Sequence, residues 1–141
     1  MLFKAFLGAT IMALLGLGAS AAAIDGNNIG ELQARQDMFK GPFKGDLTFY
    51  DTGLGACGFN DTGRHGIVAL SHHKMGTASN NNLNPHCNRR VRLRANGKTV
   101  EGIVRDKCMG CAKEDIDVSP DMFAALYDLG VGRARVTWEV I

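Results

Sequence analysis

The feature that most limits the folds open to this chain is a set of four cysteines that follow a secretion signal: Cys57, Cys87, Cys108 and Cys111. Lys4 precedes an apolar run over 5–17, and small residues over 19–23 supply cleavage sites, so residues 1–23 are predicted to be a signal peptide. In an oxidising compartment an even number of cysteines most often forms disulfides, and four cysteines allow three pairings. The sequence therefore predicts a small secreted domain with two disulfides.

Two other uses of the cysteines are open at this point. Cys108-x-x-Cys111 has the spacing of zinc ligands, and His86 lies beside Cys87. The remaining two cysteines form no second pair of this kind, so disulfides are favoured, and we expect no metal and no other cofactor. A thioredoxin-like redox role is disfavoured because no strand-then-helix pattern surrounds residues 108–111.

Length and charge exclude several classes of protein. Of the 141 residues, 118 lie beyond the signal peptide, which fits one domain. Lys4 is the only one of the 16 Lys and Arg residues in the signal, which leaves 15 basic against 14 acidic residues. Nucleic-acid binding by bulk electrostatics is therefore excluded, because it needs a clear cationic excess. No second apolar stretch suggests a membrane span, so we expect a soluble monomer without membrane contact.

Residues 24–44 are polar and interrupted by glycine, and they predict a flexible leader ahead of a domain at 45–141. Within that domain, short alternating runs predict strands at 45–50, 66–71, 89–94, 99–105 and 133–141. An Asn-Gly turn at 96–97 predicts that two of these runs form a hairpin. Asn60-Asp61-Thr62 is the only N-x-S/T sequon, which predicts an exposed loop and an N-glycan on Asn60.

One helix is predicted after Ser119, an N-cap followed by Pro120 at the first helical position. An apolar stripe runs from Met122 to Leu129, and Gly130 is predicted to end the helix. Residues 72–88 are long and polar, and they predict a loop that includes His72 and His73. Several short strands with one capped helix favour a small closed barrel over a helical bundle.

Five short motifs occur in the order seen in double-psi β-barrel proteins: Thr48-Phe49-Tyr50, Ala56-Cys57-Gly58, Ala69-Leu70-Ser71, Val104 to Cys111, and Asp115-Ile116-Asp117-Val118-Ser119. Over 45–141 the chain resembles the rare lipoprotein A-like and expansin-like group of the barwin-like superfamily, which also contains the family 45 glycoside hydrolases. Single-domain secreted members include the loosenins and a microbial papain inhibitor. The resemblance implies a mainly β fold, a six-stranded double-psi β-barrel with one or two short helices. We expect no counterpart of the carbohydrate-binding second domain of full expansins here.

The same resemblance implies two disulfides, Cys57–Cys87 and Cys108–Cys111. It also implies a groove in which Asp117 acts as a general acid or an essential binding residue, with Asp106 beside it. Two carboxylates in a shared, partly desolvated groove raise the pKa of one of them, which suits an acid. Thr48 and Tyr50 are expected to position sugars, and Trp138 is a further candidate for the sugar-binding surface.

The residues alone also have simpler interpretations. Asp115 and Asp117 precede a helix, where acidic residues commonly serve as caps and dipole partners. Asp106 lies between two basic residues and fits a solvated ion pair, and the arginines of 89–94 fit the solvated face of a strand. Tyr50 and Trp138 fit core positions. Only the family resemblance favours a functional role for Asp106, Asp117 and Tyr50 over these structural roles.

The resemblance also bears on catalysis. Inverting glycoside hydrolysis needs a second carboxylate as base, and in the related hydrolases that base lies two residues after the first-strand tyrosine. Here this position is Thr52, and the neighbouring Asp51 is expected to point to the opposite face because side chains alternate along a strand. Hydrolysis is therefore disfavoured. Lytic cleavage with one carboxyl group as both acid and base stays open.

We therefore expect a secreted, extracellular protein that binds cell-wall polysaccharide of the cellulose or chitin type and loosens it without hydrolysis. The alternative is an interaction protein on the same scaffold, either a cysteine-protease inhibitor or an effector that acts on a host protein. The resemblance alone points to a fungal source.

Overall fold

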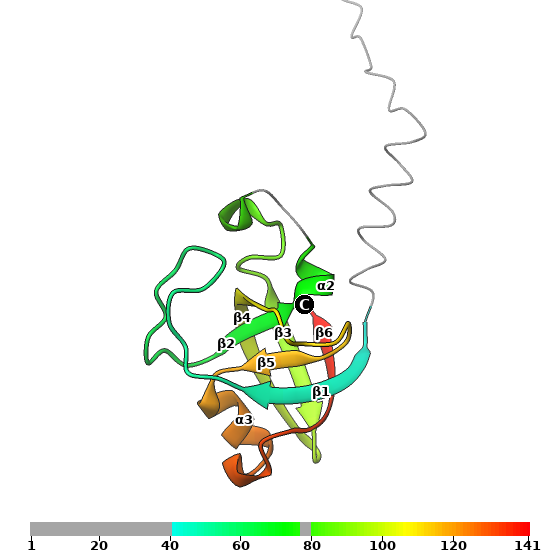
Figure 1. The fold of residues 1–141 in the computed structure, drawn as a ribbon. Helices are drawn as coiled ribbons and strands as arrows, with labels where there is room; N and C mark the ends of the chain where they lie inside the picture. Colours follow the sequence, from blue (N-terminus) through cyan, green and yellow to red (C-terminus); the bar gives the residue numbers. More distant parts are fainter. Residues whose placement is uncertain (1–40, 77–79) are drawn as a thin grey trace, which may run out of the picture.

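Six strands form a closed barrel in the order β1-β5-β2-β4-β3-β6 (Figure 1). The computed structural model describes residues 41–76 and 80–141, so the predicted signal peptide and most of the predicted leader lie outside the described residues. The strands are β1 (Phe43–Phe49), β2 (Ile67–Ser71), β3 (Arg90–Ala95), β4 (Lys98–Cys108), β5 (Ile116–Val118) and β6 (Ala134–Val140). The short helices are α2 (His72–Met75) and α3 (Pro120–Leu126), and single 3-10 turns are η1 (Asn81–Leu83) and η2 (Leu129–Val131). The mainly β, six-stranded barrel is confirmed.

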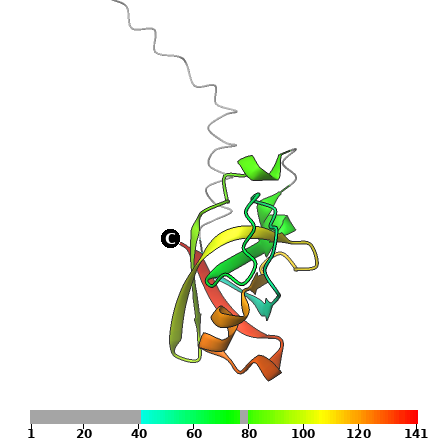
Figure 2. The ribbon, with the colours of Figure 1, turned by 90° about the vertical axis from the view of Figure 1, so that its left-hand side faces the viewer.

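The barrel mixes parallel and antiparallel neighbours. β1 pairs with β5 and β2 pairs with β4 in parallel, whereas the other four contacts are antiparallel. Two long connections, 50–66 and 72–89, join β1 to β2 and β2 to β3, and neither pair of strands is adjacent in the barrel. The parts of these connections that the structure describes lie side by side at one end of the barrel in both ribbon views (Figures 1 and 2). None of the helices in the described part of the chain has the length and apolarity needed to cross a bilayer.

The core follows the alternation that the sequence predicts. Leu47 on β1 and both Val91 and Leu93 on β3 are fully buried. The arginines of β3 lie outside and pair with Glu101 and Glu139. Further fully buried side chains include Val68, Leu70, Val104, Ile116, Val118, Phe123 and Trp138. The predicted hairpin also forms, with φ near 50° at Asn96 and 69° at Gly97.

The helix differs from its prediction in two respects. α3 ends at Leu126, because Tyr127 takes an extended backbone conformation, and Gly130 lies in η2 rather than at the end of the helix. The side chain of Asp128 accepts from the N–H of Gly130 and caps η2. Ser119 occupies the predicted N-cap position, but its hydroxyl accepts from the N–H of Ile67 on β2 at 3.1 Å. The serine therefore joins the helix start to the barrel.

Other element boundaries also shift. β1 begins at Phe43, inside the predicted leader, and β4 runs on to Cys108 beyond the predicted end at residue 105. α2 and η1 lie within the predicted loop 72–88. β5 has only three residues, too few for a periodic pattern to show.

Both disulfides implied by the resemblance are present. Cys57–Cys87 joins the two long connections, with a sequence separation of 30. Cys108–Cys111 closes the turn that follows β4, with a separation of three. The first holds two loops together, and the second shapes a single turn.

Candidate functional site

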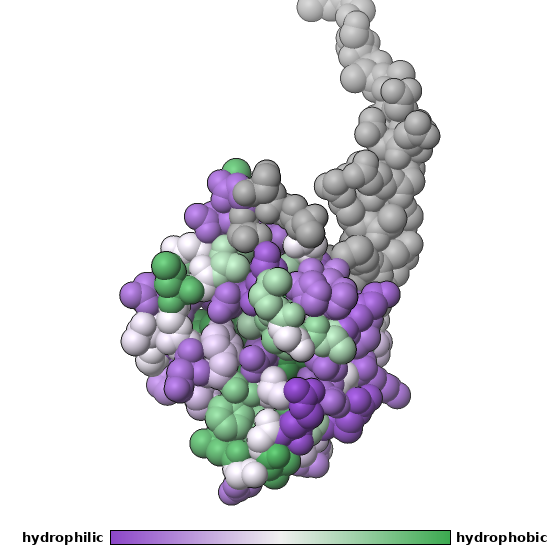
Figure 3. All heavy atoms as spheres, viewed as in Figure 1, coloured by the Kyte–Doolittle hydropathy of each residue, from purple (hydrophilic) through white to green (hydrophobic). Residues whose placement is uncertain are grey.

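A cavity of about 540 Å³ opens on the barrel beside β1, β4 and β5. We call it the groove. It is lined by Thr48, Tyr50, Ala69, Asp106, Lys107, Cys108, Met109, Gly110, Cys111, Asp117 and Arg133. The face in view in Figure 3 mixes polar and apolar residues. The lining thus includes four of the five side chains that the sequence predicts for binding or catalysis: Thr48, Tyr50, Asp106 and Asp117.

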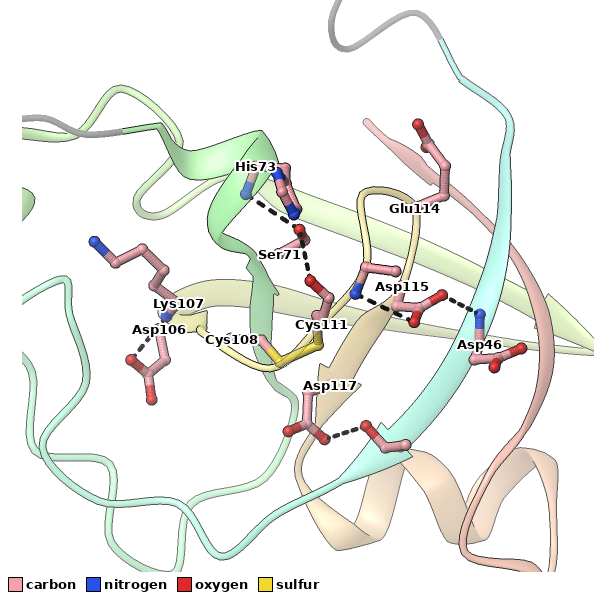
Figure 4. The surroundings of a disulfide bond; sticks show 12 residues. Asp46, Ser71, His73, Asp106, Lys107, Cys108, Cys111, Glu114, Asp115 and Asp117 are labelled. Carbon is pink, nitrogen blue, oxygen red and sulfur yellow. Dashed lines mark hydrogen bonds between the residues drawn. A yellow bond between two sulfur atoms is a disulfide. The ribbon is translucent and has the colours of Figure 1, made fainter.

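Strand register explains why these side chains meet. Thr48 on β1 pairs with Asp117 on β5, Asp117 pairs with Ala69 on β2, and Ala69 pairs with Asp106 on β4. Residues directly opposite each other on neighbouring strands project from the same face of a sheet. The four residues thus form one row across four strands, which we call the polar row. Ala69 has only a methyl group, and it lines the cavity together with Asp106 and Asp117, which Figure 4 labels.

A β-bulge completes the polar row. Val68 pairs with Val104, but the next residue, Ala69, pairs with Asp106, so Arg105 is the extra residue on β4. Without this shift Ala69 would pair with Arg105, and the Asp106 side chain would turn to the opposite face. The bulge therefore brings Asp106 into the groove.

Asp117 is half-buried, and its carboxyl group accepts a hydrogen bond from the residue opposite it on β1. The hydroxyl of Thr48 donates to Asp117 Oδ1 at 3.0 Å. Burial raises the pKa of the Asp117 carboxyl group, and the Asp106 charge adds to that rise; the hydrogen bonds of Thr48 and of the Val118 backbone, with the Arg133 charge, oppose it. The balance stays on the raised side, so Asp117 holds a proton to higher pH than an ordinary aspartate.

Asp106 is fixed by backbone donors. Its Oδ1 accepts from the N–H of Ala56 at 2.8 Å and of Lys107 at 2.7 Å. The loop can approach this closely because residue 55 is glycine: a Cβ there would lie 2.4 Å from the carbonyl oxygen of Arg105. Asp106 is therefore held as a hydrogen-bond acceptor beside the groove.

Tyr50 follows β1 and stays protonated in the groove. Burial raises the pKa of its phenol, and the Asp106 charge and a hydrogen bond to Asp106 raise it further. The Tyr50 N–H donates to the carbonyl oxygen of Val118 at 3.0 Å, which fixes the residue beside β5. Tyr50 thus places a neutral hydroxyl beside Asp106 in the groove.

The groove also contains residues that the sequence did not predict. Met109 is 67% exposed on the turn closed by Cys108–Cys111, and Lys107 precedes that turn. Arg133 pairs with Asp46 at 3.2 Å and with Asp115 at 3.7 Å. The family motif at 104–111 spans Lys107 and Met109 and could have drawn attention to them. Arg133 carried no such signal, because it is far from the motifs in sequence.

Trp138 lies apart from the groove, which corrects its assignment as a sugar-binding residue. Its side chain is fully buried, its indole N–H donates to the carbonyl oxygen of Glu114 at 2.8 Å, and its ring packs on Phe43. A ring without exposed surface offers no face to a sugar. Position 138 points inward with Val136, so the core interpretation is the correct one.

The other sequence candidates also lie outside the groove lining. The hydroxyl of Thr52 donates to the carbonyl oxygen of Asp61 at 2.6 Å, and Asp51 is exposed. Asp115 accepts from the N–H of Asp46 at 2.8 Å, so it braces β1. His72 lies in α2 and stacks on the neighbouring His73.

Asn60 and Thr62 of the sequon are exposed, whereas Asp61 between them is buried. The amide oxygen of Asn60 accepts from the hydroxyl of Thr62 at 2.7 Å. Glycosylation of Asn60 stays a prediction. Among residues 41–76 and 80–141, no group of three or more His, Cys, Asp or Glu side chains is arranged to hold a metal ion.

Comparisons with known proteins give the family. No family model matches the chain. The chain is 45% identical over 86 residues to the Allergen Asp f 7 homolog of Arthroderma benhamiae, a match that covers 60% of this chain and 29% of that protein. It thus spans about a third of the length of the curated allergens it matches. It is 37% identical over 101 residues to the Papain inhibitor of Streptomyces mobaraensis, covering 69% of this chain and 70% of the relative.

Solved structures agree with this result. The structure of the Streptomyces papain inhibitor superimposes with a TM-score of 0.67 and 34% identity, over 73% of this chain and 96% of that chain. A mutant Clavibacter michiganensis expansin in complex with cellohexaose gives a TM-score of 0.61 at 23% identity, over 72% of this chain and 50% of that chain. The expansin likeness concerns the fold alone. With its barrel, its polar row and these sequence matches, the chain belongs to the rare lipoprotein A-like double-psi β-barrel family that includes the Streptomyces papain inhibitor.

Proposed function

We propose that this chain is a secreted expansin-like or loosenin-like protein that binds β-linked wall polysaccharide in the groove and loosens it without hydrolysis. The observation that carries this proposal is the polar row, with Thr48, Asp117 and Asp106 around Ala69. The two disulfides and the family support an extracellular location.

The chemistry of the groove suits sugar hydroxyl groups. Asp106 accepts hydrogen bonds, whereas Asp117 can donate one when it is protonated and accept one when it is not. The raised pKa of Asp117 extends the protonated form toward mildly acidic pH. Thr48 and Tyr50 add hydroxyl groups on the same side. A sugar chain in this groove would exchange hydrogen bonds with neighbouring chains for hydrogen bonds with the protein.

The position of Thr52 supports binding without hydrolysis. An inverting hydrolase needs a base about 6.5–9.5 Å from its acid to activate water. The hydroxyl of Thr52 is no base at neutral pH, and it already donates to the backbone of Asp61. The expansin crystallised with cellohexaose supports cellulose-type chains as the first ligands to test.

The test is a binding and product assay on amorphous cellulose and on chitin. We expect the wild type to bind and to release no reducing ends, and we expect Asp117→Asn and Asp106→Asn to weaken binding about tenfold. Asp51→Asn is the matched control, because it makes the same chemical change on an exposed carboxylate outside the groove lining. Steady release of soluble sugar that is lost in Asp117→Asn would show an enzyme instead.

A second candidate function is inhibition of papain-like cysteine proteases. It is favoured by the relative named Papain inhibitor, whose solved chain is covered over 96% of its length, so a single barrel suffices in that protein. The assay measures papain activity on a small chromogenic peptide at rising concentrations of the chain. Undiminished papain activity at micromolar concentration of the chain would exclude this function.

A further inference from the structure

Three large apolar side chains lie exposed on the two long connections, outside the groove lining. Leu54 and Leu83 are 78% and 79% exposed, and Phe59 is 42% exposed. Leu54 and Phe59 belong to the connection 50–66, and Leu83 belongs to η1 in the connection 72–89. We call these three residues the loop surface. Large aliphatic side chains are costly to leave in water, so a group of them on loop tips suggests a contact surface.

Covalent and packing contacts join the two loops. The Cys57–Cys87 disulfide links them directly. The side chain of Asn82 packs against Gly58 so closely that a Cβ at Gly58 would lie 2.8 Å from Asn82 Oδ1. Both ribbon views place the loops together at one end of the barrel (Figures 1 and 2). Leu54 and Leu83 therefore belong to one braced unit.

Phe59 is also held in place. The Arg105 guanidinium group stacks on its ring, 3.9 Å from the centroid. Leu54 forms an isolated antiparallel bridge with Asn60, the residue that follows Phe59. A side chain that is ordered before binding loses less conformational entropy when a partner covers it. The ring of Phe59 and the backbone that carries Leu54 are thus held in place before a partner binds.

We propose that the loop surface is the contact site for a papain-like cysteine protease. This inference rests on the second candidate function above and assigns it a surface. The groove lining is rich in carboxyl and hydroxyl groups, which suits sugars, whereas the loop surface offers protruding aliphatic tips. Such tips fill a concave apolar cleft, and enzyme clefts have this form, whereas an extended polysaccharide chain does not. The solved inhibitor relative is a single barrel of this fold, so its contact lies on the barrel or its loops.

The test compares papain inhibition by the wild type with that of the double variant Leu54→Asp with Leu83→Asp. We expect the double variant to inhibit about tenfold or more weakly, because a charge replaces each anchor in the desolvated contact. The matched control is Val131→Asp, which places the same charge on a 53% exposed apolar residue in η2. We expect this control to inhibit within about twofold of the wild type, and thermal melts check that all variants fold.

The outcomes separate the two claims. A wild type that leaves papain fully active overturns the inhibitory function and the loop surface with it. A wild type that inhibits, with a folded double variant of equal potency, overturns the loop surface alone. Loss of inhibition in Val131→Asp as large as in the double variant would also overturn it, because the effect would then depend on charge and not on place.

Discussion

The two disulfides hold different regions of the molecule, and the difference separates stability from site geometry. Cys57–Cys87 closes a long stretch of chain and ties two loops at the end of the barrel. Cys108–Cys111 closes a four-residue turn whose residues all line the groove. A long closed loop restricts the unfolded chain strongly, whereas a short one restricts it little. We therefore expect the first bond to act mainly on folding and the second mainly on binding.

The largest effect is expected from Cys57→Ser with Cys87→Ser. A loop of this length corresponds to roughly 3–4 kcal/mol in the chain-entropy estimate, and each 1 kcal/mol shifts Tm by about 4–8 °C in a domain of this size. The melting temperature should fall by about 15 °C or more in calorimetry at neutral pH. A fall of only a few degrees would show that the loops are held by their other contacts.

A smaller loss of stability is expected from Cys108→Ser with Cys111→Ser, with a clear loss of binding. The turn forms one wall of the groove, and the Ser71 hydroxyl and the Cys111 carbonyl oxygen are 3.5 Å apart beneath it. Tm should fall by less than half of the change in the first pair, and binding to amorphous cellulose should weaken about fivefold. If binding is unchanged while Tm falls as far as in the Cys57 and Cys87 double variant, the second disulfide acts on folding and the proposed difference between the two disulfides is wrong.

Asp117→Asn should raise stability, in contrast to both cysteine pairs. Burial raises the pKa of Asp117 in the folded state above the ordinary value of 3.8, so the folded protein binds the proton more tightly than the unfolded chain. The penalty on the charged form is absent below pH 3.8 and complete above the raised pKa. Tm of the variant should exceed that of the wild type by roughly 2–5 °C at pH 7 and match it near pH 3. A lower Tm at pH 7 would contradict the desolvation of Asp117.

The smallest effect concerns His86, next to Cys87 in the loop region. Burial lowers the pKa of this imidazole to about 4, with a further contribution from Arg89. The unfolded chain binds the proton near pH 6.5, so stability should fall as the pH drops from 6.5 toward 4. Because the imidazole is half-exposed, solvent screening removes most of this effect, and His86→Asn should flatten this part of the pH profile of Tm by about 2–4 °C. If the slope of Tm against pH is the same in His86→Asn as in the wild type, the His86 imidazole is exposed to water in the folded protein.

The barrel and most of the groove were predictable because their signals are local or shared with the family. Alternation placed Leu47, Val91 and Leu93 in the core, and five ordered motifs indicated Thr48, Asp106 and Asp117. Element ends were less predictable. Tyr127 stops α3 by its backbone conformation, although the apolar stripe continues to Leu129.

Two features of the groove depend on tertiary structure and had no local signal. The bulge at Arg105 is defined by pairing with β2, about 36 positions earlier, so no pattern on β4 alone reveals it. Arg133 reaches the groove through its ion pairs with Asp46 and Asp115. For Trp138 a local signal existed, because the alternation along β6 predicts that its side chain points into the core. The prediction of a sugar-binding role rested only on its aromatic ring and was wrong.

Binding of a β-linked glucan chain in the groove can be followed through amide chemical shifts during titration with cellohexaose. We expect saturable shifts of the Thr48, Asp106 and Asp117 amides, with the Leu54 and Leu83 amides unchanged, and saturation of the groove shifts at about tenfold higher cellohexaose concentration in Asp117→Asn. Shifts confined to the loop surface, or none at millimolar cellohexaose, would contradict the proposed function.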